Sequence, residues 1–167
     1  RGQDGLRDVC DEFNPEPAAL DALRDPARSI VLLRTVSPAE LAPNIAPGLA
    51  EVGVLLPYSP LHQLLLDDFG GPLVATSGNV SGEPVLTSAT EAQERLAGVA
   101  DAFLHHDRPI ARPADDSVVR VIAGRARPIR LGRGIAPLEL TLPSPVPRPV
   151  LAVGGHLKTT VALAWDR

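Results

Sequence analysis

The sequence has a single cysteine and no long apolar run, and each shortage excludes something. Among its 167 residues the single cysteine is Cys10, so neither an internal disulfide nor a multi-cysteine metal site can form. This cysteine usage fits a reducing compartment, and with no visible targeting segment it predicts a cytoplasmic protein. The longest apolar runs, such as 30–33 and 52–56, are far below the roughly 20 residues that span a bilayer. We therefore expect no membrane-spanning segment and no membrane partner.

Positive charge is not in excess, and nearly all of it is carried by arginine. The net charge of -4 and the pI near 5.5 provide no general attraction to nucleic acid, so nucleic-acid binding is not expected. Fifteen of the sixteen basic residues are Arg, with Lys158 as the exception. Because arginine is favoured throughout the chain, a single Arg needs local support before it is assigned to a site. A guanidinium group does suit phosphate, since its planar fork binds two oxygens at once.

Hydrophobic periodicity predicts helices and strands in a mixed order. Helices are expected where apolar residues recur at helical spacing, often after a capping residue or proline: 4–10, 15–23, 60–69 and 88–97. Strands are expected where short apolar or alternating runs are bounded by turn residues: 29–34, 52–56, 72–75, 102–104, 117–122 and 128–131. This order predicts the α/β (α+β) class.

A change in composition predicts a domain boundary near the C-terminus. Residues 137–149 contain five prolines in thirteen residues, which is typical of a semi-extended linker. Two further strands are expected beyond it, at 150–153 and 160–164. We therefore divide the chain into a domain over 1–136, the linker over 137–149, and the start of another domain over 150–167.

The most suggestive polar cluster follows the predicted strand 72–75. Within a few residues the sequence changes from Leu-Val-Ala to Thr76, Ser77, Gly78 and Asn79. Ligands of α/β sheets usually bind at strand ends, and hydroxyl, amide and glycine N–H groups can surround an anionic or polar ligand. The alternative is an ordinary strand-to-loop turn, which has the same composition and is common.

Other strand ends carry charged side chains. Asp115, Asp116 and Ser117 precede a predicted strand, while Arg130 and Arg133 follow one. Arg108 and Arg112 flank a proline. Together these groups could balance phosphate charge and orient donors around a nucleotide or carbamoyl phosphate. Singly they are more ordinary, because an Asp pair often caps a turn and a surface Arg is usually solvated. The histidines lack metal-ligand spacing, and 154–160 lacks the spacing of a Walker loop.

The order of motifs resembles one family. The series GVLLPYSPLHQLLL, GGPLVATSGNVSGEP, ADAFLHHDRPIARPADDSVVR, RLGRGIAP and LAVGGHLKTT is similar to the carbamoyltransferase HypF family of hydrogenase maturation proteins. The middle of the chain also resembles the wider YrdC-like fold, shared with threonylcarbamoyl-adenylate synthases. The resemblance implies a YrdC-like twisted mixed sheet with flanking helices, incomplete at its N-terminus, followed by the first hairpin of a truncated actin-like domain.

The resemblance also implies a reaction. Family members form carbamoyl-adenylate from carbamoyl phosphate and ATP, with Mg²⁺ bridging the phosphates, and pass the carbamoyl group to the C-terminal cysteine of HypE. The residues that match the family's nucleotide and carbamoyl-binding positions are Thr76, Ser77, Gly78, Asn79, Arg112, Asp116, Ser117, Arg130 and Arg133. No catalytic residue is assigned.

Two features separate this chain from the family pattern. The family motif RRxRGY is replaced here by RLGRGI, so that Leu131 and Ile135 differ from it. The family's Lys/Arg-rich nucleotide segment is expected before Arg1, and we therefore expect residues 1–167 alone to be inactive. Two alternatives stay open: an O-carbamoyltransferase of antibiotic biosynthesis, with a hydroxyl as acceptor, and a non-catalytic YrdC-like module that binds double-stranded RNA.

Overall fold

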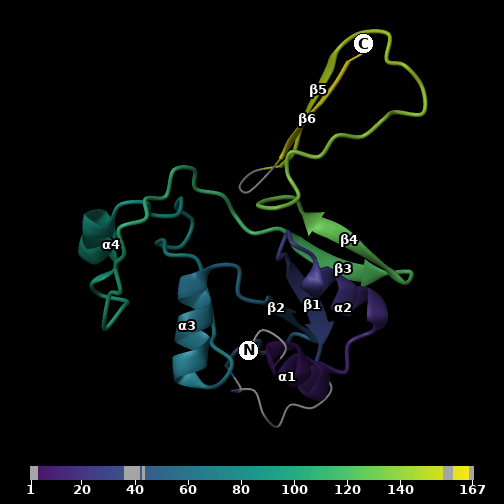
Figure 1. The fold of residues 1–167 in the computed structure, drawn as a ribbon. Helices are drawn as coiled ribbons and strands as arrows, with labels where there is room; N and C mark the ends of the chain where they lie inside the picture. The colour runs from purple at the N-terminus through teal and green to yellow at the C-terminus, as the bar shows by residue number, and fades with distance from the viewer. Residues whose placement is uncertain (1–3, 36–41, 43, 156–159, 166–167) are drawn as a thin grey trace. The chain divides into compact units, whose positions relative to one another are not determined.

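The protein folds as two compact units, Arg1–Pro72 with Asp115–Arg167, and Leu73–Ala114. The computed structural model describes residues 4–35, 42, 44–155 and 160–165 (Figure 1). The first unit holds the sheet and most of the helices, while the second holds one helix and long connecting segments. Each unit is described by itself below.

A four-stranded mixed sheet organises the first unit. Its order is β2 (Glu51–Val54), β1 (Ile30–Arg34), β3 (Val118–Ile122) and β4 (Arg125–Arg130). β1 runs antiparallel to β2 and parallel to β3, and β3 and β4 form an antiparallel hairpin. The two central strands, β1 and β3, are parallel and far apart in sequence, because a parallel pair needs a long crossover connection. The mixed sheet with flanking helices confirms the predicted fold class.

Two N-terminal helices cover one face of this sheet. α1 spans Asp4–Phe13, and α2 spans Pro17–Arg24 with its proline at the first helical position, where no N–H is needed. Alternate residues of β1 and β3 point into the core that these helices complete. The buried apolar residues are Val9, Phe13, Ala19, Leu23, Val31, Leu33, Leu56 and Val119. Each large aliphatic side chain fully buried here contributes about 1.5–3 kcal/mol.

Helix α3 (Pro60–Phe69) begins and ends where the sequence predicts. The Ser59 Oγ accepts from the His62 N–H at 3.2 Å, and Gly70 ends the helix in the left-handed conformation. Its predicted apolar face is not buried, because Leu64 and Phe69 are largely exposed.

The second unit contains α4 (Ala89–Leu96). Its N-terminus is capped by Ser88, whose Oγ accepts from the Glu91 N–H at 3.4 Å, as predicted. The predicted strands at 72–75 and 102–104 are wrong, since the backbone of both segments is irregular. A strand needs a hydrogen-bonded neighbour, and neither segment has one among the described residues. Their apolar composition alone did not create a strand.

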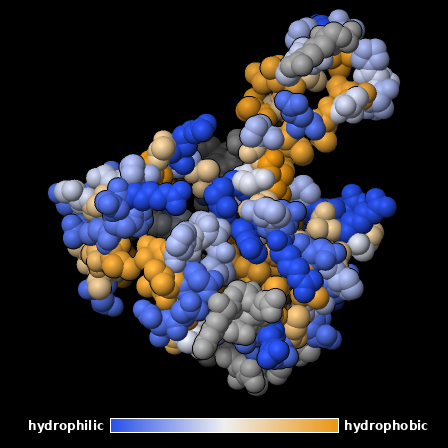
Figure 2. Space-filling view, in the orientation of Figure 1, coloured by the Kyte–Doolittle hydropathy of each residue, from blue (hydrophilic) through white to orange (hydrophobic). Residues whose placement is uncertain are grey.

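The last two strands form a separate antiparallel hairpin of β5 (Val150–Val153) and β6 (Val161–Ala164). Residues 156–159, between them, lie outside the described residues. Apolar side chains of both strands are exposed, and the space-filling view shows this hydrophobic surface (Figure 2). The linker residues 137–149 belong to no helix or strand. That 150–167 begins another domain stays a prediction. No described helix is long and apolar enough to cross a membrane.

Candidate functional site

Four of the predicted site residues lie together where β3 begins and β4 ends. The hairpin register pairs Val118 with Arg130, which puts the two ends side by side. Beyond the strands, Asp116 and Arg133 form one further parallel bridge. The loop after β4 therefore folds back along residues 115–117, and Asp116, Ser117, Arg130 and Arg133 become neighbours.

The hydroxyl group of Ser117 holds this loop in place through two hydrogen bonds. Its side chain is fully buried, and its Oγ accepts from the Gly132 N–H at 2.9 Å and donates to the Arg133 carbonyl at 3.0 Å. The Arg133 N–H in turn donates to the Asp115 carbonyl at 2.8 Å. The hydroxyl is thus engaged inside the protein, and a contact of Ser117 with a ligand stays a prediction.

Two glycines allow the loop to lie this close. A Cβ on Gly132 would be closer to the Asp115 carbonyl oxygen than real Cβ atoms approach. Gly134 has a φ of +85°, and its Cβ would lie 2.6 Å from the Ala27 carbonyl oxygen. Both positions therefore require a residue without a side chain, and Gly134 also adopts a left-handed backbone conformation that favours glycine.

Arg133 is held by contacts on several sides. Its Nε donates to Asp116 Oδ1 at 2.8 Å, and Nη2 lies 2.7 Å from the same oxygen. Nη1 and Nη2 donate to the backbone carbonyls of Ala27 and Arg28 at 3.3 and 3.2 Å. The guanidinium carbon lies 3.8 Å from the centroid of the Tyr58 ring, a cation–π geometry. This arginine therefore joins the turn before β1 and the start of α3 to the β3–β4 hairpin.

Arg130 is held differently. Its Nε donates to the Asp116 carbonyl at 2.9 Å, and the residue is half-buried. Its Nη1 and Nη2 groups have no hydrogen-bond or ion-pair partner within the described part of the chain. A guanidinium group fixed at Nε with both terminal nitrogens available matches two oxygens of a phosphate or carboxylate.

Tyr58 is a site residue that sequence reasoning missed. Its ring contacts Arg133 and meets the His62 ring edge-on, with centroids 4.6 Å apart. Burial raises the pKa of the Tyr58 phenol above its ordinary value, the Asp116 carboxylate raises it further, and Arg133 opposes both. The phenol is therefore neutral at physiological pH. Tyr58 is the one tyrosine of the sequence, but only the tertiary structure shows its contact with Arg133.

The predicted loop Thr76–Asn79 lies in the second unit. The Leu86 N–H donates to the Gly78 carbonyl at 3.0 Å, and the Asn79 N–H donates to the Ser77 carbonyl at 3.1 Å. Asn79 Nδ2 donates to the Val80 carbonyl at 2.9 Å, while Oδ1 is buried and has no donor among the described residues. Thr76 and Ser77 are exposed. Buried amide oxygens are normally hydrogen-bonded, so Asn79 Oδ1 is an exception among the described residues, and a contact of Asn79 with a ligand stays a prediction.

Arg112 also belongs to the second unit and is exposed. The structure brings four of the nine predicted residues together in the first unit, while Thr76, Ser77, Gly78, Asn79 and Arg112 lie in the second. That the two groups build one site stays a prediction.

The described residues do not provide a metal centre. They contain no group of three or more His, Cys, Asp or Glu side chains placed to hold an ion. The Asp116 carboxylate is paired with Arg133.

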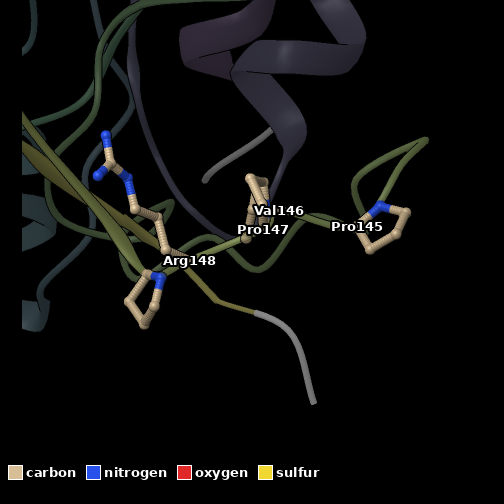
Figure 3. A pocket seen from close by; sticks show the side chains of 5 residues that line it. Pro145, Val146, Pro147 and Arg148 are labelled. Atoms are coloured by element: carbon tan, nitrogen blue, oxygen red, sulfur yellow. The ribbon is translucent and has the colours of Figure 1, made fainter.

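Two hollows lie elsewhere. One of about 450 Å³ is formed by Pro145, Val146, Pro147, Arg148 and Pro149 of the linker. Arg148 extends away from Pro145, so these side chains do not converge on one point (Figure 3). The other, of about 390 Å³, lies beside Phe13, Arg34 and Glu51. None of the predicted site residues lines either hollow.

One family model matches most of the chain. The chain belongs to the Sua5/YciO/YrdC family, whose model, described as "Telomere recombination", matches residues 4–132.

Within that family the chain is similar to part of a larger enzyme. The chain is 46% identical over 159 residues to carbamoyltransferase HypF of Synechocystis sp., which covers 95% of this chain and 21% of the relative. It is 52% identical over 150 residues to carbamoyltransferase HypF of Rhodobacter capsulatus, which covers 88% and 20%. A crystal structure of full-length HypF in the phosphate- and nucleotide-bound form matches 96% of this chain and 25% of that chain, with a TM-score of 0.84 and 40% identity. The resemblance to HypF is thus confirmed, and the chain spans about a fifth of the length of the curated relatives it matches.

Proposed function

We propose that this chain forms part of the ATP site of a carbamoyltransferase that makes carbamoyl-adenylate from carbamoyl phosphate and ATP. The observation that carries the proposal is the match of 96% of the chain, at 40% identity, to a HypF structure with phosphate and nucleotide bound. The available fork of Arg130 beside Asp116 supports it, because a nucleotide site needs a cation directed at phosphate oxygens.

The chemistry is transfer of an adenylyl group. Carbamoyl phosphate first loses phosphate to water and leaves carbamate. A carbamate oxygen then forms a bond to the α-phosphorus of ATP, the bond to the bridging oxygen breaks, and pyrophosphate leaves. Negative charge on the phosphate oxygens must be stabilised throughout, and a preorganised cation does this without reorganising at the moment of reaction. In this chain that role falls to Arg130, with Mg²⁺ arriving as part of the ATP substrate.

The Ser77–Asn79 loop is proposed to hold the carbamoyl group. A carbamoyl NH₂ is a hydrogen-bond donor, and Asn79 Oδ1 is a buried acceptor with no donor among the described residues. The exposed Ser77 hydroxyl can donate to a phosphate or carbamate oxygen. Thr76, Arg112 and Ser117 are included as further contacts of the same ligands, on the strength of the motif resemblance.

The acceptor and the cellular setting complete the proposal. We infer that the carbamoyl group passes to the C-terminal cysteine of HypE during nickel–iron hydrogenase maturation in the cytoplasm. The thiolate would attack the carbamoyl carbon, and AMP would leave. Residues 150–167 would begin the actin-like domain that carries out this transfer.

Isothermal titration tests the ATP site. The longest natural polypeptide that contains this sequence is titrated with ATP and then with carbamoyl phosphate. Arg130→Gln should weaken ATP binding about tenfold or more, which is ~1.4 kcal/mol per tenfold. The matched control is Arg125→Gln, an exposed arginine at the other end of the same strand with no ion pair among the described residues, and it should leave the affinity unchanged. Absent ATP binding, or binding that Arg130→Gln does not alter, would refute the assignment.

A second assay tests the loop and the acceptor. The double variant Ser77→Ala with Asn79→Ala should weaken carbamoyl phosphate use while the fold is retained, because both side chains lie on an irregular loop. Labelled carbamoyl phosphate should transfer its label to HypE, and not to HypE that lacks its C-terminal cysteine. Transfer to a small-molecule hydroxyl alone would contradict the proposed acceptor.

A further inference from the structure

We propose that Arg133 is a positioning residue and not a phosphate ligand: it forms a clamp that fixes Arg130 in place. The clamp consists of the Arg133 guanidinium, the Tyr58 ring, the Asp116 carboxylate and the backbone carbonyls of Ala27 and Arg28. The inference rests on the proposed function, because it assigns different tasks to the two arginines of the same site.

Donor use separates the two arginines. A guanidinium group has five N–H donors. For Arg133, the Nε–H and one Nη2–H are directed at Asp116, the second Nη2–H at the Arg28 carbonyl, and one Nη1–H at the Ala27 carbonyl. Tyr58 covers one face of the same group. One Nη1–H of Arg133 is left over, so a phosphate could form two hydrogen bonds with Arg133 only by displacing one of these partners. Among the described residues, Arg130 uses only its Nε–H.

Asp116 couples the two arginines. Its carboxylate binds Arg133, and its backbone carbonyl accepts from Arg130 Nε at 2.9 Å. One residue therefore fixes both side chains, and the orientation of its backbone depends on the Arg133 contact. Arg133 also binds the carbonyls of Ala27 and Arg28, in the turn just before β1. The position of Arg130 is therefore fixed relative to β1 as well as to its own loop.

The backbone conformation of the turn at Ala27 and Arg28 supports the clamp. Arg28 has a φ of 49°, in the left-handed region that residues other than glycine seldom adopt. Its own side chain donates to the Leu23 carbonyl at 3.2 Å, and its N–H donates to the Asp25 carbonyl at 2.9 Å. This conformation leaves the Arg28 carbonyl directed at Arg133. The clamp thus occupies a turn whose shape is set by local contacts.

The test compares two clamp variants with a ligand variant in the longest natural polypeptide. Arg133→Lys keeps the charge and loses the fork, and Tyr58→Leu removes the ring; these are made singly and together. Arg130→Lys is the ligand variant. Arg120→Gln is the control for loss of stability, because it breaks a 2.6 Å ion pair with Glu51 in the same sheet but away from the clamp. Thermal unfolding is measured without ligand, and ATP affinity by calorimetry well below the transition.

The clamp predicts coupled effects. Arg133→Lys and Tyr58→Leu should each lower the unfolding temperature without ligand. The double variant should lose less stability than the sum of the two single losses, because the two residues share one contact. Each single variant should weaken ATP binding about three- to tenfold. Arg130→Lys should weaken ATP binding more than either clamp variant and lower the unfolding temperature less, because it loses one hydrogen bond, from Nε to the Asp116 carbonyl. Arg120→Gln should lower the unfolding temperature and leave ATP affinity unchanged.

Three results would overturn the inference. ATP affinity unchanged by Tyr58→Leu, with a large loss for Arg133→Lys, would show that Arg133 binds phosphate directly. An equal loss of affinity in Arg120→Gln would reduce the effect to general destabilisation. If the double variant lost as much stability as Arg133→Lys and Tyr58→Leu added together, the two residues would not act as one clamp, whether or not ATP binds. Failure of the unsubstituted protein to bind ATP would instead refute the proposed function.

Discussion

The substitution Gly132→Ala places one methyl group at the closest approach of the loop after β4 to the start of β3. The new Cβ would collide with the Asp115 carbonyl oxygen, which is backbone and cannot rotate away. Separating the two segments would weaken the hydrogen bonds from the Arg133 N–H to Asp115 and from the Gly132 N–H to Ser117 Oγ. At about 1 kcal/mol for each bond, the expected loss is about 2 kcal/mol.

This loss is measurable in two ways. For a chain of this size it lowers the unfolding temperature by about 4–8 °C, at about 2–4 °C per kcal/mol. Hydrogen–deuterium exchange should also quicken within residues 115–135, where the two displaced segments lie. ATP affinity should fall, because the carbonyl that holds Arg130 belongs to the displaced segment.

Gly124→Ala is the matched control. Gly124 lies in the turn of the same hairpin with a φ of +71° and no atom within 4 Å of an added Cβ, so it bears only a backbone penalty of about 1–2 kcal/mol. It should lower stability without altering ATP affinity or exchange at the loop. If Gly132→Ala were as stable as the unsubstituted protein and bound ATP equally well, the close contact would not organise the site.

Other changes test the core, the clamp and a helix cap. Leu23→Ala should lower the free energy of unfolding by about 2–5 kcal/mol, because the side chain is fully buried; a smaller loss in urea denaturation would show that the core closes around the gap. The raised pKa of Tyr58 predicts a stability contribution that is complete below about pH 10 and lost as pH rises through the higher native value, since the unfolded chain releases the proton first. Tyr58→Phe should therefore flatten the stability profile above that pH, and an unchanged profile would contradict the shift. Ser88→Ala should destabilise α4 by about 1 kcal/mol, read as faster amide exchange at its first turn; unaltered exchange would show that the cap is unimportant.

Local signals in the sequence predicted most helices and the strands of the mixed sheet. Ser59, Pro60 and Gly70 mark both ends of α3 as capping rules require, and Ser88 marks the N-terminus of α4. β1 and β3 were recognisable as short β-branched runs. The failures at 72–75 and 102–104 have a common cause: apolar composition predicts burial, but strand formation depends on a neighbouring strand that local sequence cannot show.

The sequence indicated which residues cluster in the first unit, but not how their side chains contact one another. The chain order of Asp116, Ser117, Arg130 and Arg133 suggested one cluster, and the β3–β4 register brings them together. The sequence could not distinguish Arg130 from Arg133, since their difference lies in contacts with Tyr58, Ala27 and Arg28, which are distant in the chain. The relation of Thr76–Asn79 to this cluster stays a prediction.

The most direct measurement is a crystal structure of the longest natural polypeptide containing this sequence, with ATP and carbamoyl phosphate bound. We predict a phosphate oxygen within about 3 Å of Arg130 Nη1 or Nη2, with Arg133 still on Asp116 and Tyr58. Phosphate bound to Arg133 with Asp116 displaced would contradict the division of roles. A nucleotide that contacts neither arginine would contradict the site itself.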